Sequence, residues 1–482
     1  MTTDLGTIIK AYDVRGTVPD QLSPDVARAI GTAFARVVAG PEGARRVVVG
    51  HDMRDSGPAL VEAFAAGLVA AGVDVVRIGL CSTDGLYHAS GVLDAPGAMF
   101  TASHNPAAYN GIKLCRAGAR PVGQETGLAE VREVAQRLLD DPSAETDAPG
   151  DGAAPGEVSD VDMLAEYAAY LRGLVDLSRI RPLKVVVDAG NGMAGLTVPA
   201  VLGTAAGLPA LPLEVVPLFF ELDGTFPNHE ANPLEPANLV DLQAAVLAHG
   251  ADIGLAFDGD ADRCFVVDER GAAVSPSAVT ALVGLREVAK ELAAGRTPTV
   301  IHNLITSRAV PDLLTAAGAQ VVRTRVGHSF IKARMAEHRA VFGGEHSAHY
   351  YFRDFFFADT GMLAALHVLA ALGEQPHPLS ALAEMYEPYV ASGEVNSTVA
   401  DAGAATARVR DAYLAAYPDA VVDHLDGLTV AHWDDAHPQW WFNLRASNTE
   451  PLLRLNVEAA DEDIMIKVRD DVLSLVREEM QP

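Results

Sequence analysis

A pattern of strand, helix and strand recurs three times along the chain, and it limits the possible folds more than any other feature. Each copy begins with a short apolar run that ends in polar or glycine positions, at residues 47–50, 185–188 and 300–303. A helix-like stretch that closes on Ala-Ala-Gly follows, and then a second apolar run, at 73–78, 213–218 and 321–326. Strands that alternate with helices are typical of βαβ units, whose mainly parallel sheets are covered by helices. The sequence therefore predicts three related α/β domains.

A third short strand in each copy leads directly into a polar loop. The strands are expected at 98–100, 253–257 and 340–342, and the loops at 101–106, 258–263 and 344–347. In open α/β sheets, ligands bind beyond the carboxyl ends of the strands. Unrelated α/β proteins also repeat strand, loop and helix, but the common order, spacing and loop position favour true repeats. We therefore expect the three loops to contribute to one site.

Two changes in composition, with the boundary between the second and third repeats, divide the chain into four predicted domains. Residues 140–156 are dense in Asp, Ala, Pro and Gly, as in a linker, and residues 373–378 form a second break. Beyond that break, two strands about a polar loop are expected at 440–444 and 452–457. The predicted fold is α/β: three related mixed α/β domains with mainly parallel sheets plus a smaller C-terminal α+β domain. The predicted domains are residues 1–150, 157–272, 273–375 and 380–482.

The chain is strongly acidic, with 36 Lys and Arg against 64 Asp and Glu and a net charge of −28. Such a surface repels nucleic acid and anionic lipid, so we expect neither nucleic acid nor a membrane as a partner. The start of the sequence lacks the apolar run of a signal peptide, and no stretch is apolar enough to span a membrane. Cys81, Cys115 and Cys264 are far apart and lack metal-ligand spacing, as expected of reduced thiols. A cytoplasmic protein is predicted, in which an anionic substrate would need a few cations gathered in one cleft.

Three aspartates, Asp258, Asp260 and Asp262, alternate with small residues after an apolar strand. Residues two apart in an extended chain point the same way, so the three carboxylates are expected to converge. Carboxylates this close repel one another unless a hard cation lies between them, and Mg²⁺ suits so compact a set. An EF-hand is disfavoured because Arg263 occupies the position of its glycine, although Glu269 stands where its last ligand would be. A haloacid-type phosphatase with Asp258 as nucleophile and a solvated acidic turn remain as alternatives.

The first polar loop carries Ser103 between Ala102 and His104. Pro106 disfavours helical backbone at Asn105, which keeps the loop tight and exposed. A serine reacts with phosphoryl groups when a base, a metal or a preformed anion site activates it. A Ser-His hydrolase is disfavoured, because neighbours in an extended turn point apart and the glycines of a nucleophile elbow are missing. Taken alone, this hexapeptide is better explained as a structural serine turn.

Several segments, in this order, resemble the motifs of the α-D-phosphohexomutase superfamily. Residues 12–16 are similar to its N-terminal segment, 101–106 with 109–113 to its active-site serine segment, 258–263 to its metal loop, 344–347 to its sugar loop and 445–449 to its phosphate loop. The segment 347–355 is most similar to that of bacterial phosphomannomutases, some of which also act on glucose phosphates. The resemblance spans nearly the whole chain and implies four domains around a central cleft, the first three related in topology.

The resemblance implies a phosphohexomutase, an isomerase that acts by intramolecular phosphotransfer on a sugar phosphate. Ser103 would be stored as phosphoserine beside Mg²⁺ held by Asp258, Asp260 and Asp262, and would pass its phosphate through a hexose 1,6-bisphosphate. A non-catalytic sugar-phosphate-binding relative is the alternative from a different class. The implied catalytic residues are the cations Arg15, Lys113 and Arg263, with Ser103, His328 and His349. The implied substrate-binding residues are Tyr12, Glu345, Ser347, Arg445, Ser447, Asn448 and Thr449.

The phosphate and sugar loops each have a plainer explanation. Arg445 offers a fork of donors to the phosphate that is not transferred, whereas a capped hairpin turn would leave a buried arginine without a partner. Glu345 and Ser347 can form hydrogen bonds with neighbouring sugar hydroxyls. The alternative for Glu345 is an ordinary loop carboxylate in a salt bridge. Ile305 stands where many relatives carry a lysine, and His346 lies within the sugar loop, so the choice between mannose and glucose stays open.

Overall fold

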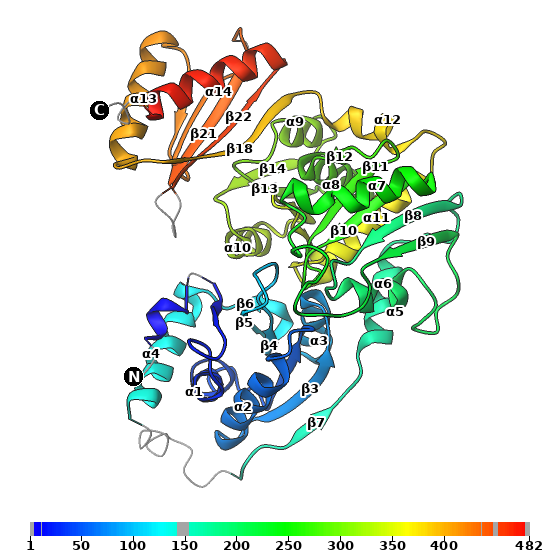
Figure 1. Ribbon diagram of the computed structural model, residues 1–482, viewed down its shortest axis with the longest axis vertical. Helices are drawn as coiled ribbons and strands as arrows, with labels where there is room; N and C mark the ends of the chain where they lie inside the picture. The colour runs from blue at the N-terminus through cyan, green and yellow to red at the C-terminus, as the bar shows by residue number, and fades with distance from the viewer. Residues whose placement is uncertain (1–3, 11, 142–153, 435, 447–451, 478–482) are drawn as a thin grey trace. The chain divides into compact units, whose positions relative to one another are not determined.

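The computed structural model of the protein describes residues 4–10, 12–141, 154–434, 436–446 and 452–477 (Figure 1). These residues form two compact units, one of residues 1–274 with 347–380 and one of residues 275–346 with 381–482. Within the described ranges, none of the helices combines the length and the apolar character needed to cross a lipid bilayer.

The first unit opens with a mixed sheet in the strand order β1-β5-β4-β2-β3-β7, with β6 beside β5. Its strands are β1 (Val14–Thr17), β2 (Arg46–His51), β3 (Asp74–Leu80), β4 (Gly97–Phe100), β5 (Tyr109–Arg116), β6 (Arg120–Pro121) and β7 (Val158–Asp160). Its helices are η1 (Leu5–Thr7), α1 (Pro24–Phe34), η2 (Ala35–Ala39), α2 (Gly57–Ala70), α3 (Thr83–Leu93), η3 (Ala117–Ala119), η4 (Gln124–Thr126) and α4 (Leu128–Asp140). Strand β2 pairs in parallel with β3 and β4, whereas β5 is antiparallel to β4 and β1.

The central strands are apolar on both faces because helices cover both. Val47 and Val49 pack with residues of α1, α2 and α4 in one core, and Val48 packs with residues of α3 in another. This arrangement accounts for the unbroken valine run of β2, which lacks the polar alternation of a half-exposed strand. Ser82 begins α3 by accepting a hydrogen bond from the Gly85 amide.

A second mixed sheet in the same unit has the order β12-β11-β10-β8-β9. Its strands are β8 (Leu183–Asp188), β9 (Leu213–Leu218), β10 (Ile253–Phe257), β11 (Cys264–Asp268) and β12 (Ala273–Val274), and its helices are α5 (Leu164–Leu174), α6 (Ala194–Val201), η6 (Pro236–Leu239) and α7 (Val240–His249). Strand β8 is parallel to β9 and β10, and β11 turns back antiparallel to β10. The unit also contains β16 (Tyr350–Phe352), η7 (Arg353–Phe355), β17 (Ala358–Asp359) and α11 (Gly361–Gly373).

The second unit begins with α8 (Pro276–Ala293), β13 (Thr299–Asn303), α9 (Ala309–Ala316), β14 (Gln320–Thr324), α10 (His328–His338) and β15 (Phe342–Gly344). Strand β13 is parallel to both β14 and β15. Helix α12 (Leu379–Ala383) and η8 (Glu384–Tyr386) then lead into the C-terminal region.

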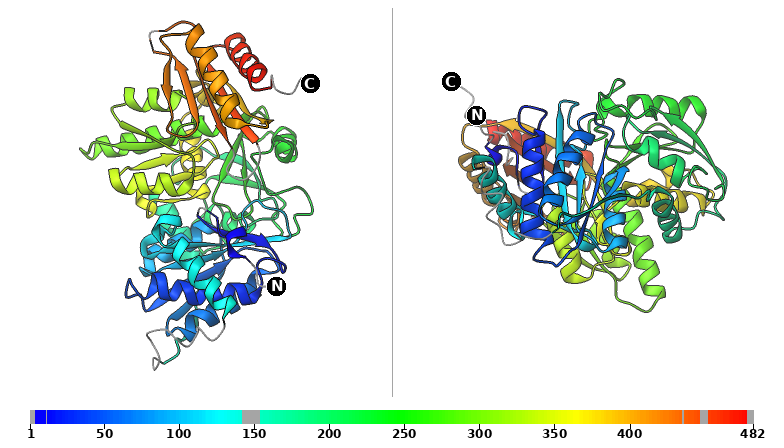
Figure 2. Two further views of the ribbon diagram at one scale, coloured as in Figure 1. Left: turned by 90° about the vertical axis from the view of Figure 1, so that its left-hand side faces the viewer. Right: turned by 90° about the horizontal axis from the view of Figure 1, so that it is seen from below.

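The C-terminal region is an antiparallel sheet in the order β18-β22-β21-β20-β19 with two helices (Figure 2). Its elements are β18 (Val390–Thr398), α13 (Ala402–Ala416), β19 (Val421–Asp423), β20 (Leu428–His432), β21 (Trp440–Ala446), β22 (Leu452–Ala459) and α14 (Glu462–Arg477). Val409 of α13 and Val472 of α14 join Trp440 and Phe442 of β21 in one core. Both helices therefore cover one face of the sheet, as in an α+β domain.

The predicted fold class is confirmed, and the strands that follow the sequence repeat lie close to their expected positions. The third strand of the third repeat was expected at 340–342 but begins at Phe342, because Arg339 ends α10 in the left-handed conformation and two linking residues follow. Strand β7 is an unexpected element. Its residues are exposed, so no apolar run marks it, yet it pairs in parallel with β3.

Candidate active site

The serine loop connects β4 to β5 and holds Ser103 in an unusual backbone conformation. Ser103 has a φ of +48°, in the left-handed region that non-glycine residues adopt only when their surroundings hold them there. Its amide donates to Thr101 Oγ1 at 2.9 Å, and its hydroxyl donates to Asp258 Oδ2 at 2.9 Å. Ser103 is only 5% exposed, so the nucleophile predicted by resemblance is buried against the aspartate loop.

The aspartate loop follows β10 and brings its three carboxylates together. Ligand atoms of Asp258, Asp260 and Asp262 lie within 4.8 Å of one another, and all three side chains are buried. The convergence was expected, but the reason given for it was wrong. The backbone makes a turn rather than an extended strand, since Ala261 has a φ of +59° and its amide donates to the Asp258 carbonyl at 3.0 Å.

Gly259 allows the two loops to meet. A Cβ atom at this position would lie 2.5 Å from the carbonyl oxygen of Ser103, closer than real side chains approach a backbone. The absence of a side chain at Gly259, between the first two aspartates, therefore lets the aspartate loop contact the serine loop.

Glu269, which would be the last ligand of an EF-hand, instead accepts hydrogen bonds from the amide and hydroxyl of Ser380.

The assumption of an extended turn predicted that His104 points away from Ser103, and this prediction was wrong. Its Nδ1 lies 3.2 Å from Ser103 Oγ, because the left-handed Ser103 backbone turns the two side chains to the same side. Arg263 donates to the same Nδ1 at 2.7 Å. Burial and then the positive charge of Arg263 hold the pKa of His104 well below its usual range. His104 is thus a neutral acceptor whose lone pair is shared with a guanidinium, unlike the free base of a Ser-His hydrolase.

Two cations pair directly with the three carboxylates. Lys113 of β5 donates to Asp260 Oδ2 at 2.7 Å and to Asp262 Oδ2 at 2.6 Å, and Arg263 Nε donates to Asp258 Oδ2 at 2.9 Å. Although burial opposes the charged form, Asp260 and Asp262 raise the pKa of Lys113 well above its ordinary value. Burial raises the pKa of Asp258 to about 7, against the lowering effect of Arg263. Two positive charges thus leave one of three buried carboxylates uncompensated.

The carboxylates fit a divalent cation. The buried oxygens Asp260 Oδ1 and Asp262 Oδ1 have no hydrogen-bond partner among the described residues. Buried carboxylate oxygens are normally hydrogen-bonded or bound to metal. An all-oxygen donor set with one excess negative charge is the chemistry that a hard cation such as Mg²⁺ prefers.

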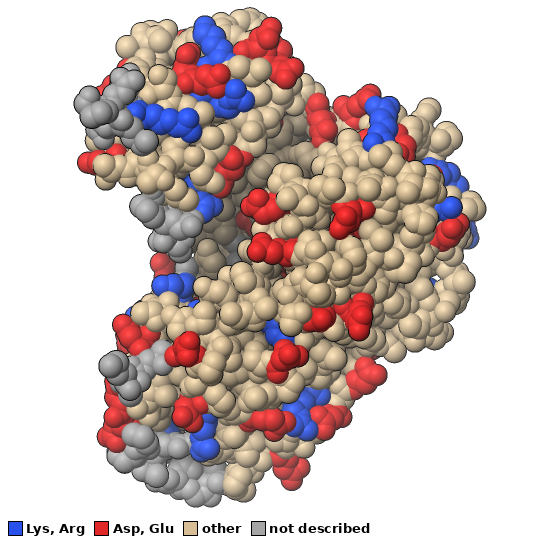
Figure 3. Space-filling model, in the orientation of Figure 1, with Lys and Arg blue, Asp and Glu red and all other residues tan. Residues whose placement is uncertain are grey.

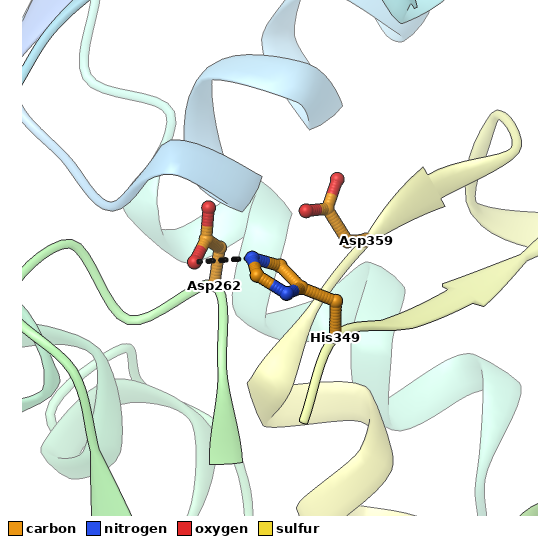
Figure 4. Close-up of side chains that lie close together, drawn as sticks. All are labelled: Asp262, His349 and Asp359. Atoms are coloured by element: carbon orange, nitrogen blue, oxygen red, sulfur yellow. Dashed lines mark ion pairs between the residues drawn. The ribbon is translucent and has the colours of Figure 1, made fainter. Parts of the chain in front are cut away.

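His349 and Asp359 lie next to the aspartate loop (Figure 4). The imidazole of His349 points toward the carboxylate of Asp262, with Nε2 at 3.8 Å from Oδ1, and Asp359 completes a second group of potential ligand atoms. Ser347 Oγ lies 3.0 Å from His349 Nδ1. Two residues predicted by resemblance, Ser347 and His349, are therefore brought to the aspartate loop.

The N-terminal segment also reaches the serine loop. Arg15 of β1 donates from Nη1 to Asn105 Oδ1 at 2.5 Å and pairs through Nη2 with Asp13 at 2.7 Å. Tyr12 is half-buried just before that strand. Arg15 therefore links the N-terminal segment to the serine loop.

The remaining predicted residues belong to the second unit. Glu345 is 2% exposed and accepts from Asn303 Nδ2 at 3.3 Å and from the Gly327 amide at 3.2 Å. His328 begins α10. Arg445 of β21 does have partners, contrary to the argument against a plain hairpin turn: Glu394 lies at 3.6 Å and Asp426 at 3.8 Å. Ser447, Asn448 and Thr449 lie outside the described residues.

Two buried residues of the site were missed from the sequence. Thr83, at the start of α3, donates from its hydroxyl to Asp260 Oδ2 at 2.6 Å and from its amide to the Asp260 carbonyl at 3.0 Å. Arg54, after β2, donates to the carbonyl of Ser103 at 3.0 Å. Thr83 follows β3 and Arg54 follows β2, and both strands are parallel strands of the sheet that contains β4. A search for polar residues at the carboxyl end of every strand of this sheet would have found them.

Comparisons with known proteins agree along the whole chain. Models of the phosphoglucomutase/phosphomannomutase family match residues 6–138 (alpha/beta/alpha domain I), 165–271 (domain II), 276–389 (domain III) and 394–475 (C-terminal domain). The phosphohexose mutases of Xanthomonas campestris pv. campestris are 42% identical over 469 residues, covering 96% of this chain and 98% of the relative. The phosphomannomutase of Salmonella typhimurium is 39% identical over 468 residues, covering 97% of this chain and 98% of the relative.

A solved structure leads to the same family. The crystal structure of a phosphoglucomutase/phosphomannomutase family protein from Burkholderia thailandensis matches with a TM-score of 0.83 and 32% identity, over 99% of this chain and 98% of that one. These matches do not support the alternatives of a haloacid-type phosphatase or a non-catalytic binding protein. The conclusion rests on three findings. The four family models match in sequence order, the relatives match over nearly their full length, and Ser103 is hydrogen-bonded to the aspartate cluster. The chain is a phosphohexomutase of the phosphoglucomutase/phosphomannomutase family.

Proposed function

We propose that the protein interconverts hexose 6-phosphate and hexose 1-phosphate, with mannose as the principal sugar and glucose as a further one, through a phosphoserine at Ser103. The observation that carries the proposal is the 2.9 Å hydrogen bond between Ser103 Oγ and Asp258 Oδ2 inside a buried group of three aspartates. The Ser103 hydroxyl therefore lies beside a candidate cation site, whose aspartates also pair with the positively charged Lys113 and Arg263. Phosphoryl transfer needs both positioning and electrostatic stabilisation.

Asp258, Asp260 and Asp262 would hold Mg²⁺, together with an oxygen of the Ser103 phosphate. When bound, Mg²⁺ supplies positive charge that stabilises the transferring phosphoryl group. Lys113 and Arg263 keep the aspartates in place and limit their mutual repulsion. Thr83 orients Asp260 through its side chain and its amide, so this ligand is positioned before a cation arrives.

In the proposed reaction, phosphorylated Ser103 donates its phosphate to the free hydroxyl of a hexose monophosphate. The resulting hexose 1,6-bisphosphate turns over in the site and returns its other phosphate to Ser103. Arg445 would bind the phosphate that is not being transferred, and Tyr12, Ser447, Asn448 and Thr449 would contribute to substrate binding. Glu345 and Ser347 would contact sugar hydroxyls, and Lys113, His328 and His349 are the candidates for proton transfer to or from the reacting hydroxyl.

The test combines kinetics with identification of the phosphorylated residue. Wild-type protein should convert mannose 1-phosphate to mannose 6-phosphate in a coupled assay with Mg²⁺ and catalytic hexose 1,6-bisphosphate, and Ser103→Ala should show no turnover. Peptide mapping should find acid-stable phosphate on Ser103. Phosphate recovered on Asp258, or sugar-phosphate binding without interconversion at any bisphosphate concentration, would refute the proposal.

The sugar preference is tested by the same assay. Glucose 1-phosphate and glucosamine 1-phosphate should be compared with mannose 1-phosphate at equal concentrations. We expect the largest kcat/KM for mannose 1-phosphate, lower values for glucose 1-phosphate and the lowest for glucosamine 1-phosphate. A higher kcat/KM for glucose 1-phosphate would reverse the assignment of the principal sugar and leave the mutase mechanism intact.

A further inference from the structure

Arg54 lies just beyond β2, and the proposed reaction gives it no role. Its guanidinium donates to four backbone carbonyl oxygens, three in the serine loop and one at the first residue of β5. Nη2 donates to Ser103 at 3.0 Å and to Asn105 at 2.6 Å, and Nη1 donates to Pro106 at 2.9 Å and to Tyr109 at 2.8 Å. One planar fork therefore holds the turn from the nucleophile to the start of β5.

The guanidinium itself is fixed in place. Arg54 is 2% exposed and Asp52 is fully buried. Asp52 lies 3.3 Å from Arg54 Nε and accepts a hydrogen bond from the Arg54 amide at 3.0 Å. The ring of Phe226 lies 5.1 Å from the guanidinium carbon. A buried charge persists only when it is paired and hydrogen-bonded, so Arg54 is a rigid support for the loop.

The loop needs such a support because Ser103 has left-handed backbone. Its amide is held by Thr101 and its carbonyl by Arg54, so both peptide groups that flank Ser103 are fixed. Without the second contact, the peptide after Ser103 could rotate and φ could return to its ordinary negative range. That rotation would move Oγ away from Asp258 Oδ2, now 2.9 Å distant.

We propose that Arg54 is a positioning residue for phosphoryl transfer: it sets the backbone of Ser103 and so places the nucleophile against the aspartate cluster. The inference rests on the proposed function of Ser103, and it assigns Arg54 no contact with substrate. Lysine cannot replace this arginine, because one ammonium group cannot span four acceptors arranged around a planar fork. The effect should appear in kcat, since the sugar-binding residues are left unchanged.

The experiment compares Arg54→Lys with a matched control, Arg172→Lys. Arg172 also donates to three backbone carbonyls, those of Val201 at 2.6 Å, Gly203 at 2.5 Å and Pro209 at 2.5 Å, but none of them is in the serine loop. We expect kcat to fall about 100-fold in Arg54→Lys, with KM within about twofold of wild type. Both constants should stay at wild-type values in Arg172→Lys.

Hydrogen exchange measured by mass spectrometry gives a second readout that does not depend on turnover. Peptides covering residues 101–116 should exchange faster in Arg54→Lys than in wild type, and those peptides should be unchanged in Arg172→Lys. A folded Arg54→Lys protein with wild-type kcat, or an equal loss of kcat in the control, would overturn the proposal. Unchanged exchange over residues 101–116 would overturn it as well.

If Arg54→Lys does not fold, Phe226→Leu loosens the same guanidinium more gently and should still speed exchange over residues 101–116 and lower kcat severalfold. Wild-type values for both in that variant would overturn the proposal. If wild-type protein shows no mutase turnover, the proposed function fails, and the exchange comparison alone decides whether Arg54 holds the loop.

Discussion

Replacing Gly259 with alanine tests the contact between the serine and aspartate loops. The added Cβ would lie 2.5 Å from the carbonyl oxygen of Ser103, whereas real Cβ atoms essentially never come closer than 3.0 Å. Since 3.0 − 2.5 = 0.5, the loops must separate by at least 0.5 Å. A displacement of 1 Å in an active site can lower a rate by about 100-fold, so half that displacement corresponds to about tenfold. Overpacking should also cost about 1–3 kcal/mol of unfolding free energy.

The assay measures kcat and KM for mannose 1-phosphate, with urea denaturation of the same protein. Gly173→Ala is the matched control, because a Cβ at Gly173 meets nothing within 4 Å and the residue lies in α5. The control should keep wild-type kcat and gain about 0.5–1 kcal/mol of stability from better helix propensity. We expect kcat to fall about tenfold or more in Gly259→Ala, with a smaller change in KM. A folded Gly259→Ala protein with the kcat of wild type would show that the loop separation does not control the reaction.

Three further predictions concern charge. Lys113→Met removes the cation shared by Asp260 and Asp262, and should lower the free energy of unfolding by about 3–5 kcal/mol in urea denaturation with chelator present; an unchanged midpoint would contradict the pairing. Mg²⁺ at 100 times its dissociation constant should stabilise the wild type by about 2.7 kcal/mol relative to chelator, and Asp260→Asn should lose most of that gain in a thermal melt. The hydrogen bond to Asp188, helped by the Glu230 carbonyl, raises the pKa of His229. The stabilisation by protonated His229 is therefore complete below about pH 6.5 and is lost as pH rises through the raised pKa, so the Tm advantage of wild type over His229→Gln should shrink as the pH is raised above about 6.5.

Strands that are buried on both faces could be predicted from the sequence almost to the residue. The runs at 47–50, 185–188 and 253–257 correspond to β2, β8 and β10, because an unbroken β-branched or apolar run has few other uses in a protein with covered sheets. Strand β7 could not be predicted in this way, since its residues are exposed and carry no apolar signal. Its position depends on backbone pairing with β3 and on the ion pair between Arg77 of β3 and Asp160 of β7.

The members of the site could be predicted only in part, for a reason that lies in the backbone. Ser103 and Ala261 both have positive φ without being glycine, so nothing in the sequence marks the turns that they make. The orientation of His104 and the turn of the aspartate loop both depend on those two residues. Thr83 and Arg54 are distant in sequence from Ser103, and only the parallel pairing of β2 with β3 and β4 brings the three strand ends together.

The role expected for the cations also changes once the structure is considered. Arg15, Lys113 and Arg263 were expected to give the cleft a positive potential despite the net charge of −28, and acidic side chains are spread over the surface seen in Figure 3. Lys113 and Arg263, however, are already paired with Asp258, Asp260 and Asp262, so these five groups together carry −3 + 2 = −1. A phosphate dianion on Ser103 would raise the local negative charge to −3, in a buried site where repulsion is poorly screened. Adding one divalent cation would reduce that charge to −1, so a phosphate on Ser103 would need the cation in addition to the two basic side chains that pair with the aspartates.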